Sequence, residues 1–200
     1  MDQNKSNINP KKIIIFISGR GSNMKAIIDA IDHGILKGIV EITSVFSNNP
    51  EAAGLITAKR MGINCHSLNA KGKKREDYDQ EVMNWLQTQD FDYIILAGYM
   101  RIISPFLVKA YKGKIINIHP ADTREHQGLH AYEWAFDNNF GTTKITVHYV
   151  TEELDAGQII AQADVDLNGA HTLEEVEERG LAVEHILYPE TLKQLFTHEK

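Results

Sequence analysis

Short apolar segments alternate with segments of helical periodicity through the first half of the chain, and this alternation restricts the fold more than any other feature. Residues 12–18 (KIIIFIS) form an almost continuous apolar run, typical of a strand buried on both faces. Strands that alternate with helices form parallel units with right-handed crossovers, which predicts a doubly wound sheet. The further elements predicted in this half are strands at 39–47, 64–68 and 93–97 and helices at 23–33, 50–61 and 76–89.

The second half has a different pattern. Its predicted elements are a strand at 115–120, a helix at 129–138, strands at 142–150 and 158–167 separated by an acidic turn, and a closing helix at 173–196. Neighbouring strands joined by a short turn pair in the antiparallel sense. The predicted fold class is therefore α/β, a doubly wound, mostly parallel sheet with helices on both faces and an antiparallel C-terminal extension.

Length and composition limit the class of protein. With 200 residues, 42% of them hydrophobic, we predict one domain over 11–200 after a flexible N-terminal arm, 1–10. The formal net charge of −6 argues against nucleic acid as a partner, since such binding relies on basic surface. The sequence has no apolar run long enough for a membrane span or a signal peptide, and its single cysteine, Cys65, excludes an intramolecular disulfide. A cytoplasmic location is expected.

The strand at 115–120 ends in two polar side chains that are candidates for catalysis. Asn117 and His119 are two residues apart, so they project from the same side of the pleat before Pro120 ends the strand. At the carboxyl end of a parallel strand, both would face a crevice in which ligands bind. The structural alternative is that Asn117 caps a turn and His119 is a hydrogen-bonded core histidine.

The acidic turn at 151–157 offers a partner for this histidine. Asp155 precedes Ala156, Gly157 and an apolar strand, so its carboxylate is expected to point toward the sheet edge instead of into water. A carboxylate beside His119 favours the imidazolium and is expected to raise the pKa of His119 toward neutral pH. His119 would then serve as a general acid.

A glycine-containing turn, Gly19-Arg20-Gly21-Ser22-Asn23, follows the first strand and precedes a helix that Ser22 or Asn23 is expected to cap. Free amides at a helix N-terminus attract anions, which suggests a phosphate site. Met24 replaces the third glycine of a dinucleotide fingerprint, and the Gly-Lys-Ser/Thr of a Walker loop is absent from the turn. The alternative is a tight turn with a capping serine.

Metal binding and nucleophilic catalysis find less support. His126 and His130 are four residues apart with Asp122 nearby, but Gly128 disfavours a helix between them and the glutamate of H-E-x-x-H is missing. No metal is predicted. Cys65 lies in a short apolar strand without an activating partner in the sequence, and no serine stands in a G-x-S-x-G elbow.

Motifs spread in order through almost the whole chain resemble those of the folate-dependent glycinamide ribonucleotide formyltransferases. None is decisive alone, but their order and spacing together are specific. The matching segments are Ile17-Ser18-Gly19-Arg20-Gly21-Ser22-Asn23, Val45-Phe46-Ser47-Asn48, Leu96-Ala97-Gly98-Tyr99-Met100-Arg101-Ile102-Ile103-Ser104-Pro105, Asn117-Ile118-His119-Pro120, Gly128-Leu129-His130, Val147-His148-Tyr149-Val150, Leu154-Asp155-Ala156-Gly157 and Glu184-His185-Ile186-Leu187-Tyr188-Pro189.

The resemblance implies transfer of a formyl group from the cosubstrate 10-formyltetrahydrofolate to the primary amine of a phosphoribosylglycinamide in purine biosynthesis. It implies that Gly21, Ser22 and Asn23 hold the substrate phosphate and that Glu184 and Met100 receive the amine end. The implied folate-binding residues are Arg75, Met100, Arg101, Ile102, Ile103, Val150, Thr151, Glu152, Glu153 and Leu154.

Physical reasoning agrees with this reaction. Attack of an amine on a formamide carbon builds a tetrahedral oxyanion, which needs preorganised donors and a group that passes protons to the leaving nitrogen. Asn117 supplies an amide N–H and His119 an imidazolium N–H, while Asp155 keeps that histidine charged. Neither a metal nor a covalent intermediate is required.

Two segments depart from the family pattern. The family usually has Ser-Leu-Leu-Pro after the His-Pro pair, where this chain has Ala121-Asp122-Thr123-Arg124-Glu125-His126-Gln127, and Leu181-Ala182-Val183 replaces polar residues ahead of Glu184. We expect 122–127 to be a mobile polar loop that contacts the core weakly, with Arg124 or His126 supplying a cation to the substrate phosphate.

These departures leave alternatives for the function. The acceptor could be another primary amine, such as an amino-sugar nucleotide, or the chain could be a catalytically inactive folate- or nucleotide-binding module. The trio of Asn117, His119 and Asp155 argues against the inactive module, because binding alone does not need it. A transfer RNA formyltransferase is disfavoured, because such enzymes carry a further C-terminal domain and this chain has no basic surplus. We expect small-molecule substrates and a monomer or homodimer.

Overall fold

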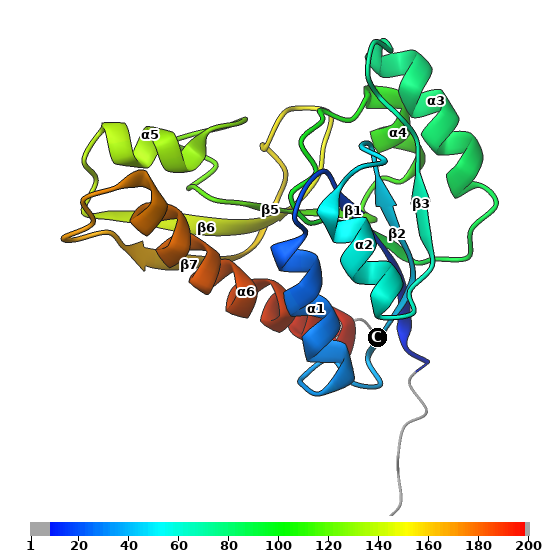
Figure 1. The fold of residues 1–200 in the computed structure, drawn as a ribbon, viewed down its shortest axis with the longest axis horizontal. Helices are drawn as coiled ribbons and strands as arrows, with labels where there is room; N and C mark the ends of the chain where they lie inside the picture. Colours follow the sequence, from blue (N-terminus) through cyan, green and yellow to red (C-terminus); the bar gives the residue numbers. More distant parts are fainter. Residues whose placement is uncertain (1–8, 199–200) are drawn as a thin grey trace, which may run out of the picture.

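In the computed structural model, which describes residues 9–198, a seven-stranded sheet with the order β3-β2-β1-β4-β5-β6-β7 forms the centre of the molecule (Figure 1). Strands β1 to β5 pair in parallel, whereas β6 pairs antiparallel with β5 and with β7. The predicted fold class is confirmed. Residues 1–8 of the predicted arm lie outside the described range.

The strands and helices, in chain order, are β1 (Lys11–Ile17), α1 (Ser22–Asp32), β2 (Val40–Ser47), α2 (Ala53–Arg60), β3 (Cys65–Ser67), α3 (Arg75–Leu86), β4 (Tyr93–Leu96), α4 (Pro105–Ala110), β5 (Ile115–His119), α5 (Ala131–Asp137), β6 (Thr142–Tyr149), β7 (Ile159–Asp166) and α6 (Leu173–His198). The sequence pattern gives no sign of α4, because six residues are too few to show helical periodicity. The cap expected at Ser22 or Asn23 is wrong: Gly21 precedes α1 in the left-handed region (φ 72°), and no side chain caps the helix.

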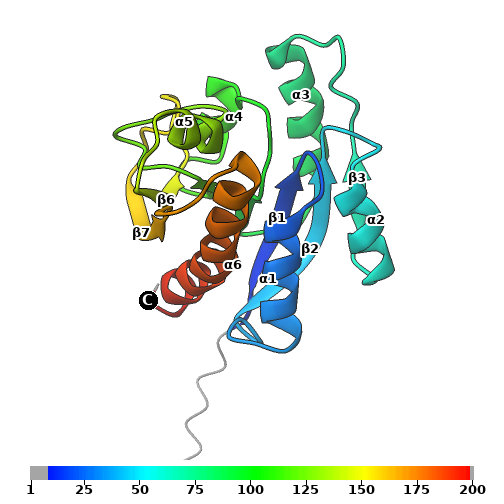
Figure 2. The same ribbon diagram turned by 60° about the vertical axis from the view of Figure 1, so that its left-hand side comes forward.

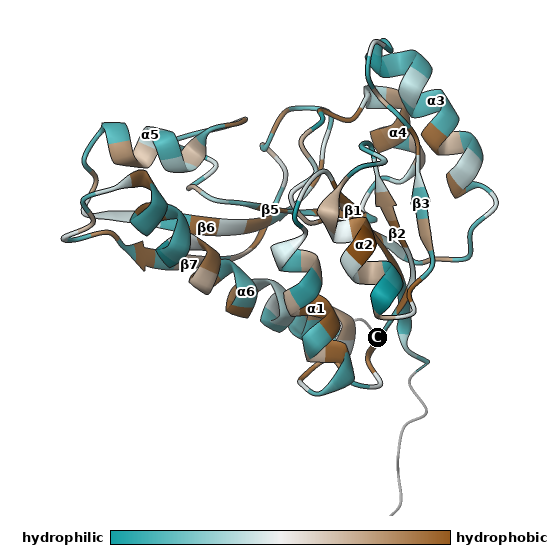
Figure 3. Ribbon diagram, in the orientation of Figure 1, coloured by the Kyte–Doolittle hydropathy of each residue, from teal (hydrophilic) through white to brown (hydrophobic). Residues whose placement is uncertain are grey.

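The alternation of side chains along β1 divides the hydrophobic core into two parts. Ile13, Ile15 and Ile17 pack on the face covered by α1, α2 and α6, while Ile14 and Phe16 pack on the face covered by α3 and α4. Figure 2 shows α1 and α6 side by side on the first face, and Figure 3 shows that the central strands are mostly hydrophobic. Both faces of β1 are therefore buried, as its unbroken apolar run predicts.

The strand register brings the carboxyl ends of β1, β4 and β5 together. Phe16 of β1 pairs with Leu96 of β4, and Leu96 pairs with Asn117 of β5. The strand order reverses between β1 and β4, the position at which ligands bind in doubly wound sheets. Asn117 is thus at the level where the loops after β1 and β4 leave the sheet.

Tyr188 connects α6 to this part of the sheet through hydrogen bonds. Its side chain is completely buried, and its hydroxyl group donates to the carbonyl oxygens of Leu96 and Ile116, each 3.0 Å away. Burial raises the pKa of the Tyr188 hydroxyl well above its usual value, so this group remains a donor. The contact ties the last helix to two neighbouring strands beside the cleft.

We expect Tyr188→Phe to lower the free energy of unfolding by about 1–2 kcal/mol, because two buried carbonyl groups lose a shared donor while the ring packing is kept. Urea denaturation followed by circular dichroism measures the change. Tyr111→Phe, at a half-buried tyrosine after α4, is the matched control and should have a smaller effect. Equal losses in the two variants would contradict this account.

Candidate active site

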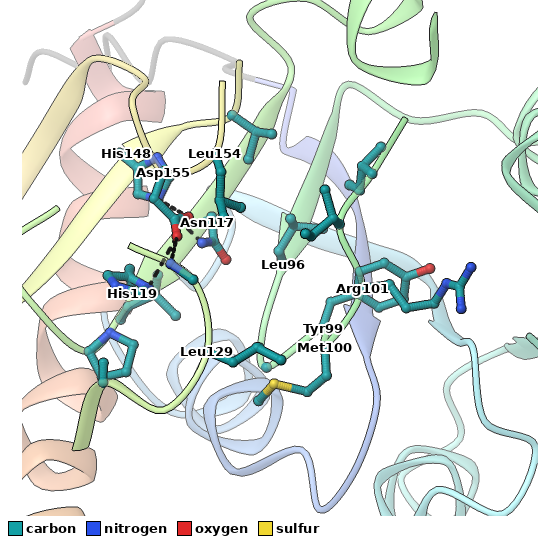
Figure 4. Close-up of a pocket in the computed structure, with 18 of the residues that line it drawn as sticks. Leu96, Tyr99, Met100, Arg101, Asn117, His119, Leu129, His148, Leu154 and Asp155 are labelled. Atoms are coloured by element: carbon teal, nitrogen blue, oxygen red, sulfur yellow. Dashed lines mark hydrogen bonds and ion pairs between the residues drawn. The ribbon is translucent and has the colours of Figure 1, made fainter. Parts of the chain in front are cut away.

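A cavity of about 540 Å³ opens at the carboxyl ends of β4 and β5 (Figure 4). Its walls come from residues 98–103 after β4, the end of β5, residues 128–131 at the start of α5, and residues 150–155 after β6. Asn117, His119 and Asp155 all line it, so the structure brings together the three residues singled out in the sequence.

These residues form one polar cluster with a further histidine, His148. Asn117 Nδ2 donates to His148 Nε2 at 3.2 Å, and the Asp155 carboxylate lies 3.5 Å from His148 Nε2 and 3.7 Å from His119 Nδ1. The other nitrogen of His119, Nε2, donates to the carbonyl oxygen of His126 at 3.1 Å. In Figure 4 the cluster occupies one side of the cavity, and Met100 and Arg101 lie on the other.

The expected effect of Asp155 on His119 is only partly correct. Asp155 raises the pKa of His119, as predicted, but burial of the imidazole has a larger and opposite effect, so the pKa lies below its usual value. His119 is 4% exposed, and the nearby rings of His148 and His126 add to the decrease. The resting histidine is therefore neutral near pH 7, not an imidazolium.

The local backbone directs Asp155 into the cluster. Asp155 lies in the left-handed region (φ 48°), and its Oδ2 accepts a hydrogen bond of 2.8 Å from the Gly128 amide. Burial favours a higher pKa for the Asp155 carboxyl, but contacts with His148, the Gly128 amide and His119 outweigh it, and the pKa lies below its usual value. The cluster thus holds a carboxylate anion.

His148 is missing from the residues singled out in the sequence, because its place in the cluster depends on strand register. In β6 it pairs with Asn117 across the antiparallel ladder, so the two side chains lie on the same face of the sheet. The sequence predicts the strand but not its register, and the register decides which residue of β6 faces Asn117.

A second cavity, of about 720 Å³, adjoins the first. Residues of the turn after β1, including Gly21, Ser22 and Asn23, line it together with Glu184. The side chains of Met100 and Leu129 are exposed and line both cavities, and they point toward one another in Figure 4. An apolar seam therefore separates the two spaces.

Glu184 is the buried acid of the second cavity. It is 4% exposed, and its carboxylate accepts hydrogen bonds from the Asn23 side-chain amide and the Tyr132 hydroxyl. Burial raises the pKa of the Glu184 carboxyl, although both hydrogen bonds oppose this. Tyr132 was also absent from the candidate residues; its ring occupies the space beside Gly180, where an added Cβ would overlap it. Only packing between α5 and α6 reveals this contact.

The implied folate-binding residues divide into two groups. Those after β4 and β6 line the first cavity: Met100, Arg101, Ile102, Ile103, Val150, Thr151, Glu152, Glu153 and Leu154. Arg75 does not line it; its exposed guanidinium pairs with Glu76. The charges of Arg75 and Arg101 both act on the buried Asp79, and the Arg101 guanidinium lies 4.5 Å from the centre of the Tyr78 ring.

The expectation of a weakly attached loop at 122–127 is wrong. Asp122 and Thr123 are both buried, and the Asp122 carboxylate pairs with Arg124 and Lys144. The proposed cation for the second cavity is not found there either. Arg124 is engaged with Asp122, the His126 ring packs against Trp134, and both residues lie outside the cavity lining. Among the described residues, no group of three or more histidines, cysteines or acids could hold a metal ion.

Residues 11–192 match the formyl transferase family, and the chain belongs to that family. It is 40% identical over 178 residues to phosphoribosylglycinamide formyltransferase of Escherichia coli K12, covering 88% of this chain and 83% of that protein. It is 36% identical over 183 residues to the human trifunctional purine biosynthetic protein adenosine-3, covering 91% of this chain and 18% of the human protein.

Solved structures of proteins with the same name are also similar. The crystal structure of phosphoribosylglycinamide formyltransferase from Bacillus halodurans superimposes with a TM-score of 0.89 at 39% identity, covering 95% of this chain and 97% of that one. The family resemblance predicted from the motifs is confirmed. The protein is a formyltransferase of the folate-dependent type. In the described part of the chain, no helix is long and apolar enough to cross a membrane.

We expect Asp155→Asn to lower the pKa of His119 further, because the carboxylate charge is the main factor that favours the imidazolium. An NMR titration of the imidazole measures this pKa. Asp137→Asn, at an exposed carboxylate on α5, makes the same chemical change outside the cluster and should leave the pKa unchanged. A higher His119 pKa in Asp155→Asn would refute the assignment.

Tyr132→Phe is expected to raise the pKa of the Glu184 carboxyl, because the lost hydrogen bond favours the charged form. Gly180→Ala should change the pKa in the same direction by displacing the Tyr132 ring. Carbon-13 NMR of the glutamate carboxyl groups measures both variants, with Tyr111→Phe as the control. A fall in the pKa would show that Tyr132 does not stabilise the carboxylate.

Proposed function

We propose that this protein transfers the formyl group of 10-formyltetrahydrofolate to the amine of 5'-phosphoribosylglycinamide, in de novo purine biosynthesis. The observation that carries the proposal is the meeting of two cavities at the Met100 and Leu129 seam, one lined by the Asn117, His119 and Asp155 cluster and the other by the turn after β1. The names of the similar bacterial and animal proteins support the same acceptor. Such a role places the enzyme in the cytoplasm, with small-molecule substrates.

The second cavity would hold the acceptor. The backbone of Gly21, Ser22 and Asn23 lies at the N-terminus of α1, where free amides and the helix dipole favour a phosphate. The Glu184 carboxylate, buried and held by two donors, suits the hydroxyl or amine groups of the ribosyl-glycinamide. The acceptor amine would then reach the seam beside Met100.

The first cavity would hold the folate. Met100, Ile102 and Leu154 offer exposed apolar surface to a flat ring system, and backbone groups of the 150–154 segment offer hydrogen bonds to its polar edge. The cationic side chains of Arg101 and Arg75 suit the carboxylates of the folate tail. In this orientation the formyl carbon lies near the polar cluster.

The reaction moves one proton as well as the formyl group. The amine nitrogen attacks the formyl carbon, the carbonyl oxygen becomes an oxyanion, and the second N–H of the Asn117 amide is free to donate to it. His119, neutral at rest, takes the proton that the attacking nitrogen loses. The Asp155 carboxylate stabilises the imidazolium while it exists, and the proton then passes to the leaving folate nitrogen as the carbon–nitrogen bond breaks.

The lowered pKa of His119 sets the pH dependence. Because the neutral imidazole accepts the proton, the rate should fall only when pH drops below the pKa of His119, which lies under the ordinary histidine value of about 6.5. The acid limb of the kcat/KM profile, which reports the free enzyme, should therefore lie below that value. A limb above it would contradict the assignment of His119 as a neutral proton acceptor.

A formyl-transfer assay with 10-formyltetrahydrofolate and a panel of amines tests the reaction. We expect turnover with phosphoribosylglycinamide, and a decrease in kcat of about 100-fold or more in both Asn117→Ala and His119→Ala. His33→Ala, at an exposed histidine after α1, is the control and should keep full activity. Turnover with an amino-sugar nucleotide alone would refute the acceptor, and absence of formyl transfer to every amine would refute the reaction.

A further inference from the structure

The segment 121–128, between β5 and α5, contacts both members of the His119 and Asp155 pair. The carbonyl oxygen of His126 accepts a hydrogen bond from His119 Nε2 at 3.1 Å, and the amide of Gly128 donates one to Asp155 Oδ2 at 2.8 Å. The C-terminal part of this turn therefore contacts the imidazole through a carbonyl group and the carboxylate through an amide. This turn replaces the apolar segment that is usual in the family.

Asp122 anchors the turn from within. It is 3% exposed, and its carboxylate accepts hydrogen bonds from Arg124 Nε at 2.8 Å, from Arg124 Nη2 at 2.6 Å and from Lys144 Nζ of β6 at 3.2 Å. Its carbonyl oxygen accepts from the amides of Glu125 and His126 at 2.9 and 3.0 Å. The side chain and the backbone of one residue thus shape the turn and tie it to β6.

The Asp122 carboxyl remains ionised near neutral pH because of the cations around it. Hydrogen bonds from Arg124, together with the contact with Lys144, hold the pKa of the Asp122 carboxyl far below its usual value. The cations themselves remain partly in water, with the Arg124 side chain more exposed than that of Lys144. The carboxylate is therefore neutralised without burial of either cation.

We propose that Asp122 is a positioning residue for the His119 and Asp155 pair and acts on it through the 121–128 turn. Its effect on catalysis rests on the function proposed above, whereas its effect on the geometry of His119 does not. Asp122 holds the His126 carbonyl in place, and this carbonyl selects which nitrogen of His119 carries the resting proton.

The position of the resting proton on His119 decides which of its two ring nitrogens can accept another proton. With the resting proton on Nε2, the lone pair lies on Nδ1, which faces the Asp155 carboxylate at 3.7 Å. Nδ1 is then the nitrogen that accepts the proton in the reaction, and the new N–H lies beside an anion. The other titratable groups that face His119 are His126, from the turn, and His148, from β6. If the turn is disturbed, His119 can carry its resting proton on either nitrogen.

Asp122→Ala tests the proposal with three measurements. We expect faster hydrogen exchange at the amides of 125–128, a mixture of imidazole tautomers at His119 in nitrogen-15 NMR, and a decrease in kcat of about tenfold with KM values within about twofold of the wild type. Asp29→Ala, which removes an exposed carboxylate paired with Lys25, is the control and should change none of these.

Two outcomes would overturn the proposal: unchanged exchange in the turn, or faster exchange with the tautomer and kcat of the wild type. If Asp122→Ala does not fold, Asp122→Asn keeps the size of the side chain and removes the charge that Arg124 and Lys144 contact. Asp29→Asn makes the same chemical change at an exposed carboxylate paired with Lys25. We expect the tautomer mixture and the loss of kcat only in Asp122→Asn, and equal effects in both variants would also overturn the proposal.

The failure of the proposed function is distinguishable from failure of this inference. A wild-type protein that transfers no formyl group would refute the function, whereas the tautomer and exchange measurements need no substrate and would still decide the role of Asp122.

Discussion

The pairing of β5 with a parallel strand on one side and an antiparallel strand on the other determines where the polar cluster of the first cavity lies. The parallel neighbour, β4, brings the loop after Leu96 to the same end of the sheet as Asn117. The antiparallel neighbour, β6, places His148 directly opposite Asn117. The segment after β6 then turns back, so that the Asp155 carboxylate contacts both histidines. A shift of one residue in either pairing would turn these side chains to the opposite face of the sheet.

The features that could be predicted from the sequence are local. The period of two in a strand identifies Asn117 and His119, and the boundary between a strand and a helix identifies Gly21 to Asn23. His148 and Tyr132 depend instead on register and on packing between distant segments, which no short window of sequence contains. Glu184 is predicted only through the family resemblance, because no local sequence pattern distinguishes a functional acid within a long helix. The short helix α4 falls below the length at which periodicity is visible.

Two of the expectations that failed, the raised pKa of His119 and the weak attachment of 122–127, share a physical cause, since both judged polar groups by their type and not by their surroundings. A carboxylate beside His119 suggested a raised pKa, but the loss of water around the imidazole outweighs that charge. The polar composition of 122–127 suggested weak attachment, but a carboxylate whose hydrogen bonds are all satisfied can be buried as firmly as an apolar side chain. Burial and hydrogen bonding depend on the tertiary structure, so the sequence alone does not show which of these opposing effects is larger.

The position of Tyr188 and Glu184 on α6 has a consequence for how the protein is made. Synthesis on the ribosome proceeds from the N-terminus, so all seven strands leave the exit tunnel before this helix does. Until then the carbonyl groups of Leu96 and Ile116 lack the Tyr188 hydroxyl, and the second cavity lacks its acid. The sheet can therefore form before α6 docks, but the second cavity is complete only after this helix is in place.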